Sequence, residues 1–167
     1  MQRDEELTQV MNRLKLLFSG HNSARAPHLE LGESGERSAI DYLIECEGYR
    51  LVVANFRVPL GRGLRGQKLN AEIDAVAYDG DTLVFVEVKT RTASDIVAPE
   101  RAVDVRKQRQ IARAARRYRQ LMKVIDEPYR YDVVTVQPGE DVERIELFRG
   151  YFDDRVFQKS RYFRRDA

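Results

Sequence analysis

The chain has 167 residues, which is the size of one ordinary domain of roughly 100 to 200 residues. With 43% hydrophobic and 34% charged residues it can bury a core, which excludes a wholly disordered protein. No apolar run is longer than the four residues of Leu83–Val86, so the sequence predicts no membrane-spanning helix. Residues 1–7 are polar, so we expect no secretory signal and a cytoplasmic protein.

The cysteine and histidine content argues against two kinds of site. Cys46 is the only cysteine, so it cannot form an internal disulfide. His21 and His28 are too few to complete a Cys/His zinc site with it. A catalytic arrangement of the Ser-His-Asp or Cys-His kind is similarly poorly supported.

The net charge of +2 hides three basic clusters. Residues 101–119 hold eight basic residues and one acid, Asp104. Residues 57–68 hold four basic residues and no acid, and residues 155–165 hold five. Grouped Lys and Arg indicate a polyanion-binding surface, because contact with phosphates releases counterions. A solvated helix face and a loose tail are the alternative.

Two helices are predicted in the first part of the chain. Apolar residues at three-and-four spacing over residues 4–18 predict an amphipathic helix. We expect it to dock on the main domain or on a partner chain, with a specific recognition element as the alternative. Residues 35–47 predict a second helix, with Ser34 as N-cap and Gly48 as the left-handed stop.

Three strands are predicted next. Leu51–Phe56 is typical of a strand, and the glycines of Gly61–Gly66 predict a mobile basic loop after it. Ala71–Tyr78 and Thr82–Lys89 are two further strands joined by Asp79-Gly80, a pair that indicates a two-residue hairpin turn.

The hairpin turn determines which residues face each other. If the Asp-Gly pair is the turn, Tyr78 pairs with Asp81 and Glu72 lies opposite Glu87. Side chains alternate along a strand, so one face of the hairpin is predicted to hold Glu72, Asp74, Leu83, Phe85, Glu87 and Lys89. Valines occupy the other face of Thr82–Lys89, which is typical of a central, covered strand. A three-residue loop would reverse these faces.

The last predicted elements complete an α/β core. Residues 100–125 predict a long helix, and Tyr131–Val136 and Arg144–Phe148 alternate like later strands. A helix, a three-stranded meander, a crossover helix and further strands describe a mixed sheet flanked by helices.

Acids crowd the predicted face of the hairpin. Glu72, Asp74 and Glu87 outnumber Lys89, and facing carboxylates repel. Raised pKa values or a bound divalent cation would relieve the excess. Magnesium suits oxygen ligands, so this constellation has the parts for hydrolysing a phosphodiester. A salt-bridged surface hairpin is the alternative.

The same residues carry a resemblance. Asp74, followed after a turn by Glu87-Val88-Lys89, resembles the PD-(D/E)XK nuclease signature. A wider pattern runs from about residue 31 to about residue 148 and includes Gly35-Glu36, Gly48-Tyr49, Asn55, Glu72-Ile73-Asp74, Val84–Arg91, Lys107 and Arg130–Val134. It resembles the bacterial YraN-like family of predicted endonucleases, which are similar to archaeal Holliday junction resolvases.

The resemblance implies an α/β fold with a restriction-endonuclease-like core, in which helices flank a central mixed β-sheet. We divide the chain into an N-terminal helical extension at residues 1–30, a nuclease-like domain at residues 31–150 and a basic C-terminal tail at residues 151–167.

The resemblance also implies a site for Mg²⁺ or Mn²⁺. The implied metal ligands are Asp74, Glu87, the Val88 carbonyl and Glu36, and Lys89 is the implied catalytic lysine. Gly35 would let the start of the helix approach the metal. Taken alone, Glu36 is better explained as a solvated first-turn carboxylate stabilised by the helix dipole.

Contacts with DNA are expected at Arg62, Arg65, Arg91, Lys107, Gln108 and Arg113. For Lys107 and Gln108, a solvated helix face is the alternative. Arg91 could form a local salt bridge, and Glu72 could pair with an arginine instead of joining the site.

The chain departs from the family pattern at two places. Ala71 stands where family members usually have Gly, and the stretch from Asn55 to Glu72 is several residues longer than usual.

Together with the resemblance, the sequence predicts a metal-dependent DNA endonuclease, acting on branched or single-stranded DNA, with substrate shape open. The alternatives are a DNA-binding module with a vestigial acidic cluster and a structural partner in a repair or uptake assembly. Cutting of junctions would favour a homodimer, because it needs two sites related by symmetry.

Overall fold

The computed structural model describes residues 27–91, 102–139 and 142–158, and the helix predicted over residues 4–18 lies outside them. Its elements are α2 (Pro27–Glu45), β1 (Arg50–Arg62), β2 (Lys68–Asp79), β3 (Thr82–Thr90), α3 (Val105–Leu121), β4 (Tyr129–Gln137), β5 (Arg144–Phe152) and the 3-10 helix η2 (Asp154–Phe157). No helix within these ranges is long and apolar enough to cross a membrane.

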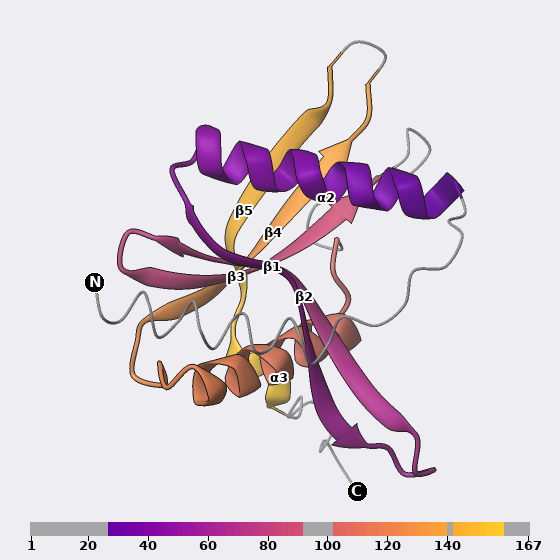
Figure 1. Cartoon of the computed structure of the whole chain (residues 1–167), viewed down its shortest axis with the longest axis vertical. Helices are drawn as coiled ribbons and strands as arrows, with labels where there is room; N and C mark the ends of the chain where they lie inside the picture. Colours follow the sequence, from indigo (N-terminus) through magenta and orange to yellow (C-terminus); the bar gives the residue numbers. More distant parts are fainter. Residues whose placement is uncertain (1–26, 92–101, 140–141, 159–167) are drawn as a thin grey trace, which may run out of the picture.

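The strands form one five-stranded sheet in the order β1-β2-β3-β4-β5. β3 and β4 are parallel and are connected through α3, whereas the other neighbours are antiparallel. Helix α2 packs on one face of the sheet and α3 on the other (Figure 1). The predicted α/β core, a mixed sheet between helices of the restriction-endonuclease-like kind, is therefore confirmed.

Strand β3 is central and buried on both sides, as its apolar pattern predicts. Leu83 and Phe85 point toward α3, where the Phe85 ring meets Tyr118 edge-on at 5.6 Å between centroids. Val84 and Val86 point toward α2 and pack with Leu43. Each face of the sheet thus has its own hydrophobic core, and β3 belongs to both.

The register of the β2–β3 hairpin differs from the prediction. Tyr78 pairs with Leu83 and Asp79 with Thr82, so the turn is Gly80-Asp81, and the predicted Tyr78–Asp81 pair is wrong. The reason is the left-handed backbone of Gly80, whose φ of 57° suits the first central position of a tight hairpin turn. The shift is two residues, so side chains near the turn keep their predicted faces.

A kink in the β1–β2 pair lies beside Asp74. Ala54 pairs with Ala75 and Phe56 with Ile73, which places Asn55 opposite Asp74. Asn55 has a φ of 52°, a left-handed conformation that Asn tolerates better than most residues. The kink changes the alternation, because Ile73 packs in the core under α3 whereas Ala75 packs under α2.

The kink corrects the predicted position of Glu72. Ile73 faces α3, so its neighbour Glu72 points to the opposite face and shares no face with Asp74. The cross-strand partner of Glu72 is Arg57, with Nε 3.0 Å from Oε1. The prediction that Glu72 faces Glu87 is therefore wrong, and the alternative of an arginine partner is confirmed.

Helix α2 begins earlier than predicted. It starts at Pro27 rather than at residue 35, so Ser34 lies inside the helix and is not its N-cap. Proline is favourable at the first position of a helix, because its missing N–H has no intrahelical partner there. The predicted end is confirmed, since Gly48 has a φ of 72° and the N–H of Tyr49 donates to the Leu43 carbonyl at 2.8 Å.

The other bounds differ more modestly. Helix α3 begins at Val105, because Asp104 caps it by accepting from the Lys107 N–H at 2.8 Å. Of the stretch Gly61–Gly66 that was predicted as a loop, Gly61 and Arg62 belong to β1, and Gly63–Gly66 form the turn before β2 begins at Lys68. At the carboxyl end, β5 continues through Phe152 and η2 packs against α3.

A buried network around Asp132 holds the middle of β4 to the end of β2. Asp132 on β4 is fully buried. Its carboxylate accepts from the Tyr49 hydroxyl at 2.9 Å, from the Gly150 N–H at 2.8 Å and from the Arg130 guanidinium. Arg130 also pairs with Asp79 at 2.5 Å. This network joins β4 to β2, to the backbone of β5 and to Tyr49, the residue just before β1.

We expect Asp132→Ala to lower the free energy of unfolding by about 3 to 5 kcal/mol, because the change breaks a buried, hydrogen-bonded ion pair. Urea denaturation measures the loss. The matched control is Asp126→Ala at an exposed loop acid, which should change stability little. Equal effects of the two changes would contradict the structural role of Asp132.

Candidate active site

Glu87 lies at the centre of the candidate site. It is on β3 and is only 2% exposed. Its Oε1 accepts from the ammonium of Lys89 at 2.8 Å and from that of Lys107 at 3.0 Å. Lys89 reaches it because residues two apart on a strand share a face. The first turn of α3 brings in Lys107.

The crossover explains why Lys107 reaches Glu87. β3 and β4 are parallel, so the chain leaves the carboxyl end of β3 and starts α3 before returning. The Asp104 cap holds the first turn of the helix, and there Lys107 points toward the sheet. The structure thus joins two lysines from different elements at one carboxylate.

Asp74 lies beside this group on β2. Its Oδ2 accepts from the Val88 N–H at 2.7 Å, so the carboxylate is held against the backbone of β3. Burial, together with the charge of Glu87, raises the pKa of Asp74 to about 7. The Val88 hydrogen bond and the charge of Lys107 act in the opposite direction. Asp74 and Glu87 are therefore close enough to interact electrostatically, as the sequence predicted.

The donor set fits a hard cation. The second oxygen of Glu87, Oε2, is buried and has no hydrogen-bond partner within the described residues, which is costly unless something positive binds there. In the described ranges no group of three or more acidic, His or Cys side chains is placed to hold an ion. Magnesium commonly uses only one or two carboxylates and takes its remaining ligands from water and phosphate. Asp74, Glu87 and the Val88 carbonyl would suit that mode.

Helix α2 approaches the same end of β3. A Cβ on Gly35 would lie 2.2 Å from Oγ1 of Thr90, so only glycine allows the helix to lie this close to the strand. Gly35 therefore permits a close approach, although from inside the helix and not from its start. The next residue, Glu36, is half-buried, and its charge contributes to the raised pKa of Asp74. Glu36 thus lies near the site without completing a three-acid cluster.

The residues predicted to contact DNA occupy three places. Arg62 and Arg65 lie at the far end of the β1–β2 pair. Arg91 follows β3, and its N–H donates to the Val136 carbonyl at 2.8 Å. On α3, the Gln108 side chain donates to the Val103 carbonyl at 2.8 Å, and the Arg113 guanidinium lies 5.9 Å from the centre of the Phe157 ring. Only Lys107 of this set directly contacts Glu87.

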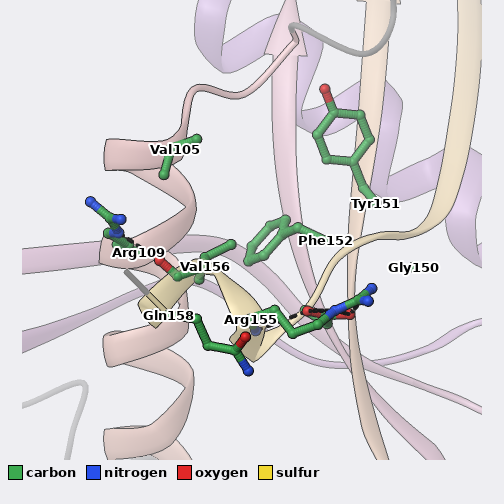
Figure 2. A pocket seen from close by; sticks show the side chains of 9 residues that line it. Val105, Arg109, Gly150, Tyr151, Phe152, Arg155, Val156 and Gln158 are labelled. Carbon is green, nitrogen blue, oxygen red and sulfur yellow. Dashed lines mark hydrogen bonds and ion pairs between the residues drawn. The ribbon is translucent and has the colours of Figure 1, made fainter. Parts of the chain in front are cut away.

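A pocket elsewhere contains none of the predicted site residues. It has a volume of about 470 Å³ and lies between the start of α3, the end of β5 and η2 (Figure 2). Its cations have local partners, since Arg109 donates to the Val156 carbonyl at 2.6 Å and Arg155 pairs with Asp153 at 2.7 Å. The candidate site is therefore the group around Glu87 and not this pocket.

Residues 35–136 match the family described as "Uncharacterised protein family UPF0102". The chain belongs to the UPF0102 family. It is 41% identical over 111 residues to a UPF0102 protein of Symbiobacterium thermophilum, which covers 66% of this chain and 85% of that protein. It is 38% identical over 130 residues to a UPF0102 protein of Geotalea uraniireducens, which covers 77% and 94%. The resemblance to the YraN-like group is confirmed.

The UPF0102 match extends from Gly35 to the end of β4 and so includes every residue around Glu87. Sequence reasoning expected Lys107 to reach a DNA phosphate, with a solvated helix face as the alternative, and it missed the contact between Lys107 and Glu87. The signal that favours the contact is Asp104 three residues earlier. An N-cap after a parallel strand places the first turn of the helix at the carboxyl end of that strand.

We expect Asp74→Asn to raise the melting temperature of the metal-free protein by a few degrees at pH 8. The pKa of Asp74 lies above that of an unfolded aspartate, so the fold loses stability as the pH rises from about 4 to about 7, and the whole loss is present above 7. The asparagine oxygen can still accept from Val88. The gain should shrink as the pH falls from about 7 and vanish below about 4, where the carboxyl becomes protonated in both states, as a thermal scan against pH would show.

Magnesium should raise the melting temperature of the unmodified protein and not that of Asp74→Asn, because a ligand stabilises only the state that binds it. Asp81→Asn, at an exposed acid in the turn, is the matched control and should respond like the unmodified protein. Equal magnesium responses for Asp74→Asn and the control would contradict the metal-binding role of Asp74.

Proposed function

We propose that this UPF0102 protein is a DNA endonuclease that depends on Mg²⁺ or Mn²⁺ and acts on branched or single-stranded DNA. The observation that carries the proposal is Glu87, a buried carboxylate that faces two lysines and has one buried oxygen without a described partner. Asp74 beside it supplies a second oxygen ligand. Burying this many charges together is costly for a purely structural element.

The surface around the site favours a polyanionic substrate. Helix α3 exposes a row of arginines at Arg106, Arg109, Arg113, Arg116 and Arg117. The opposite side of the helix is apolar and covers the sheet through Ile111, Ala114 and Tyr118. A cationic face so close to Glu87 would bring a phosphate backbone to the site through a salt-dependent attraction.

The residues divide the chemistry between them. Asp74 and Glu87 would hold the cation, and the Val88 carbonyl would be a further ligand. Lys89 would orient the attacking water or stabilise negative charge that develops on the phosphoryl oxygens. Lys107 would hold a non-bridging phosphate oxygen once the substrate competes for its ammonium. When bound, the metal ion supplies Lewis acidity and lowers the pKa of a coordinated water.

A DNA-binding module without catalysis is the second candidate. Its support is that Lys89 and Lys107 both pair with Oε1 of Glu87 and so compensate its charge. Both candidates predict salt-sensitive DNA binding, so cutting must be measured. A homodimer is part of the proposal, since junction cutting requires two symmetry-related sites. We also propose a cytoplasmic location.

We expect the purified protein to cut a synthetic four-way junction in the presence of magnesium. Lys89→Met should lower the cutting rate roughly 10²- to 10³-fold, because it removes a charge that acts on the transition state and keeps the aliphatic chain. Gel analysis of labelled strands gives the rate. Lys123→Met, at an exposed lysine outside the site, should cut like the unmodified protein. Cutting that survives Lys89→Met would refute the role of the lysine, and no cutting with intact DNA binding would favour the second candidate.

A further inference from the structure

The β1–β2 pair projects beyond the rest of the sheet. Pairing of β2 with β3 ends at Ala75 and Val86, whereas pairing of β1 with β2 continues to Arg62 and Lys68. Residues 57–72, here called the arm, therefore form a two-stranded ribbon whose base is buried in the core at Val58 and Ala71 and whose tip projects beyond the rest of the sheet (Figure 1).

The root of the arm is fixed and its tip is ordered by hydrogen bonds. At the root, Gln110 of α3 donates to the Asn70 carbonyl at 3.2 Å. At the tip, the Gly63 N–H donates to the Gln67 carbonyl at 2.8 Å, and the Gly66 N–H donates to the Gly63 carbonyl at 2.9 Å. The second bond closes a β-turn whose two central residues are Leu64 and Arg65. Central residues of a turn direct their side chains away from the ribbon.

Leu64 is the outermost apolar side chain of the arm. Its relative exposure is 108%, so it touches almost nothing in the protein. A single exposed leucine is common on protein surfaces, and exposure alone carries no conclusion. Its neighbours distinguish it. Between Arg57 and Glu72 the sequence has three cations and no acid, and within the described residues none of the three forms a salt bridge. The three cations are Arg62, Arg65 and Lys68.

We infer that the arm binds in a groove of duplex DNA and that Leu64 inserts between bases at a branch point or another weakly stacked step. The inference rests on the proposed nuclease function and specifies its substrate class. A two-stranded ribbon fits a DNA groove, cations along it bind the phosphates, and an apolar side chain at its tip can act as a wedge. At a branch point the bases are already partly unstacked, so insertion costs less there than in a regular duplex.

The arm and the site are on the same strand, which limits their separation on DNA. From Lys68 to Asp74 a strand rises about 20 Å at roughly 3.3 Å per residue. Leu64 lies farther out, in the β-turn at the tip of the arm. This is less than one helical turn of duplex, which measures about 34 Å. Insertion at a branch would therefore place the site on the duplex within one turn of that branch.

A fluorescence experiment tests the wedge. The probe is a synthetic four-way junction with 2-aminopurine at the branch, whose emission rises when the base unstacks. The protein is the full chain with Lys89→Met, in magnesium, so that the DNA stays intact. We expect the parent chain to increase the emission and Leu64→Ser to abolish the increase. Affinity for the junction should fall about tenfold while affinity for linear duplex is unchanged.

Two matched variants control the test. Leu64→Met keeps an apolar tip and should retain the emission, whereas Ile125→Ser removes an exposed apolar side chain outside the arm and should have no effect. Arg65→Ala should weaken binding to both DNAs alike. It should also reduce the slope of the logarithm of the binding constant against the logarithm of salt concentration by about one. Because Leu64 is exposed, its variants should melt like the parent.

The outcomes separate the two proposals. Emission retained in Leu64→Ser, or an equal loss of affinity for junction and linear DNA, overturns the wedge and leaves the cutting assay to decide the nuclease. A parent chain that binds neither DNA overturns both. A lost emission in Leu64→Ser with linear binding intact supports the wedge even if no cutting is found.

Discussion

The site depends on one buried carboxylate and the charges that compensate it. Glu87 is out of contact with water on the central strand, so its charge is tolerated only because Lys89 and Lys107 lie within 3.0 Å of it. Each lysine requires a different part of the fold, since one needs the alternation of β3 and the other needs α3 to start at its cap. The sheet and the crossover helix therefore determine the electrostatics of the site together.

Much of the fold follows from local patterns in the sequence. The alternation of Thr82–Lys89 predicts a covered central strand, and Gly48 predicts the end of α2, because both depend on neighbours a few residues apart. The start of α2 and the hairpin register are less accessible. Serine is a good N-cap but also occurs inside helices, so Ser34 does not exclude an earlier helix start at Pro27. Asp-Gly suits a turn in more than one position, so it leaves the register open by two residues.

The candidate site is also predictable where it depends on residues that are close in the sequence. Asp74, Glu87 and Lys89 come from one hairpin, and strand alternation alone brings Glu87 and Lys89 together. Glu72 satisfies the same alternation and was placed with them wrongly. The kink at Asn55, on β1, directs Glu72 to the opposite face of the sheet. Periodicity within β2 cannot reveal a break in alternation that lies opposite a left-handed residue of β1.

The kink at Asn55 and Asp74 has a consequence for both ends of β2. On one side of it, β2 pairs with β3 and carries a carboxylate into the buried charge cluster. On the other side, β2 pairs only with β1, turns its apolar residues toward α3 and continues outward as the arm. Without the kink, strict alternation would direct Ile73 toward α2 and Glu72 toward α3. The kink therefore places Asp74 with Glu87 and leaves Glu72 to pair with Arg57. It also places the root of the arm next to Asp74.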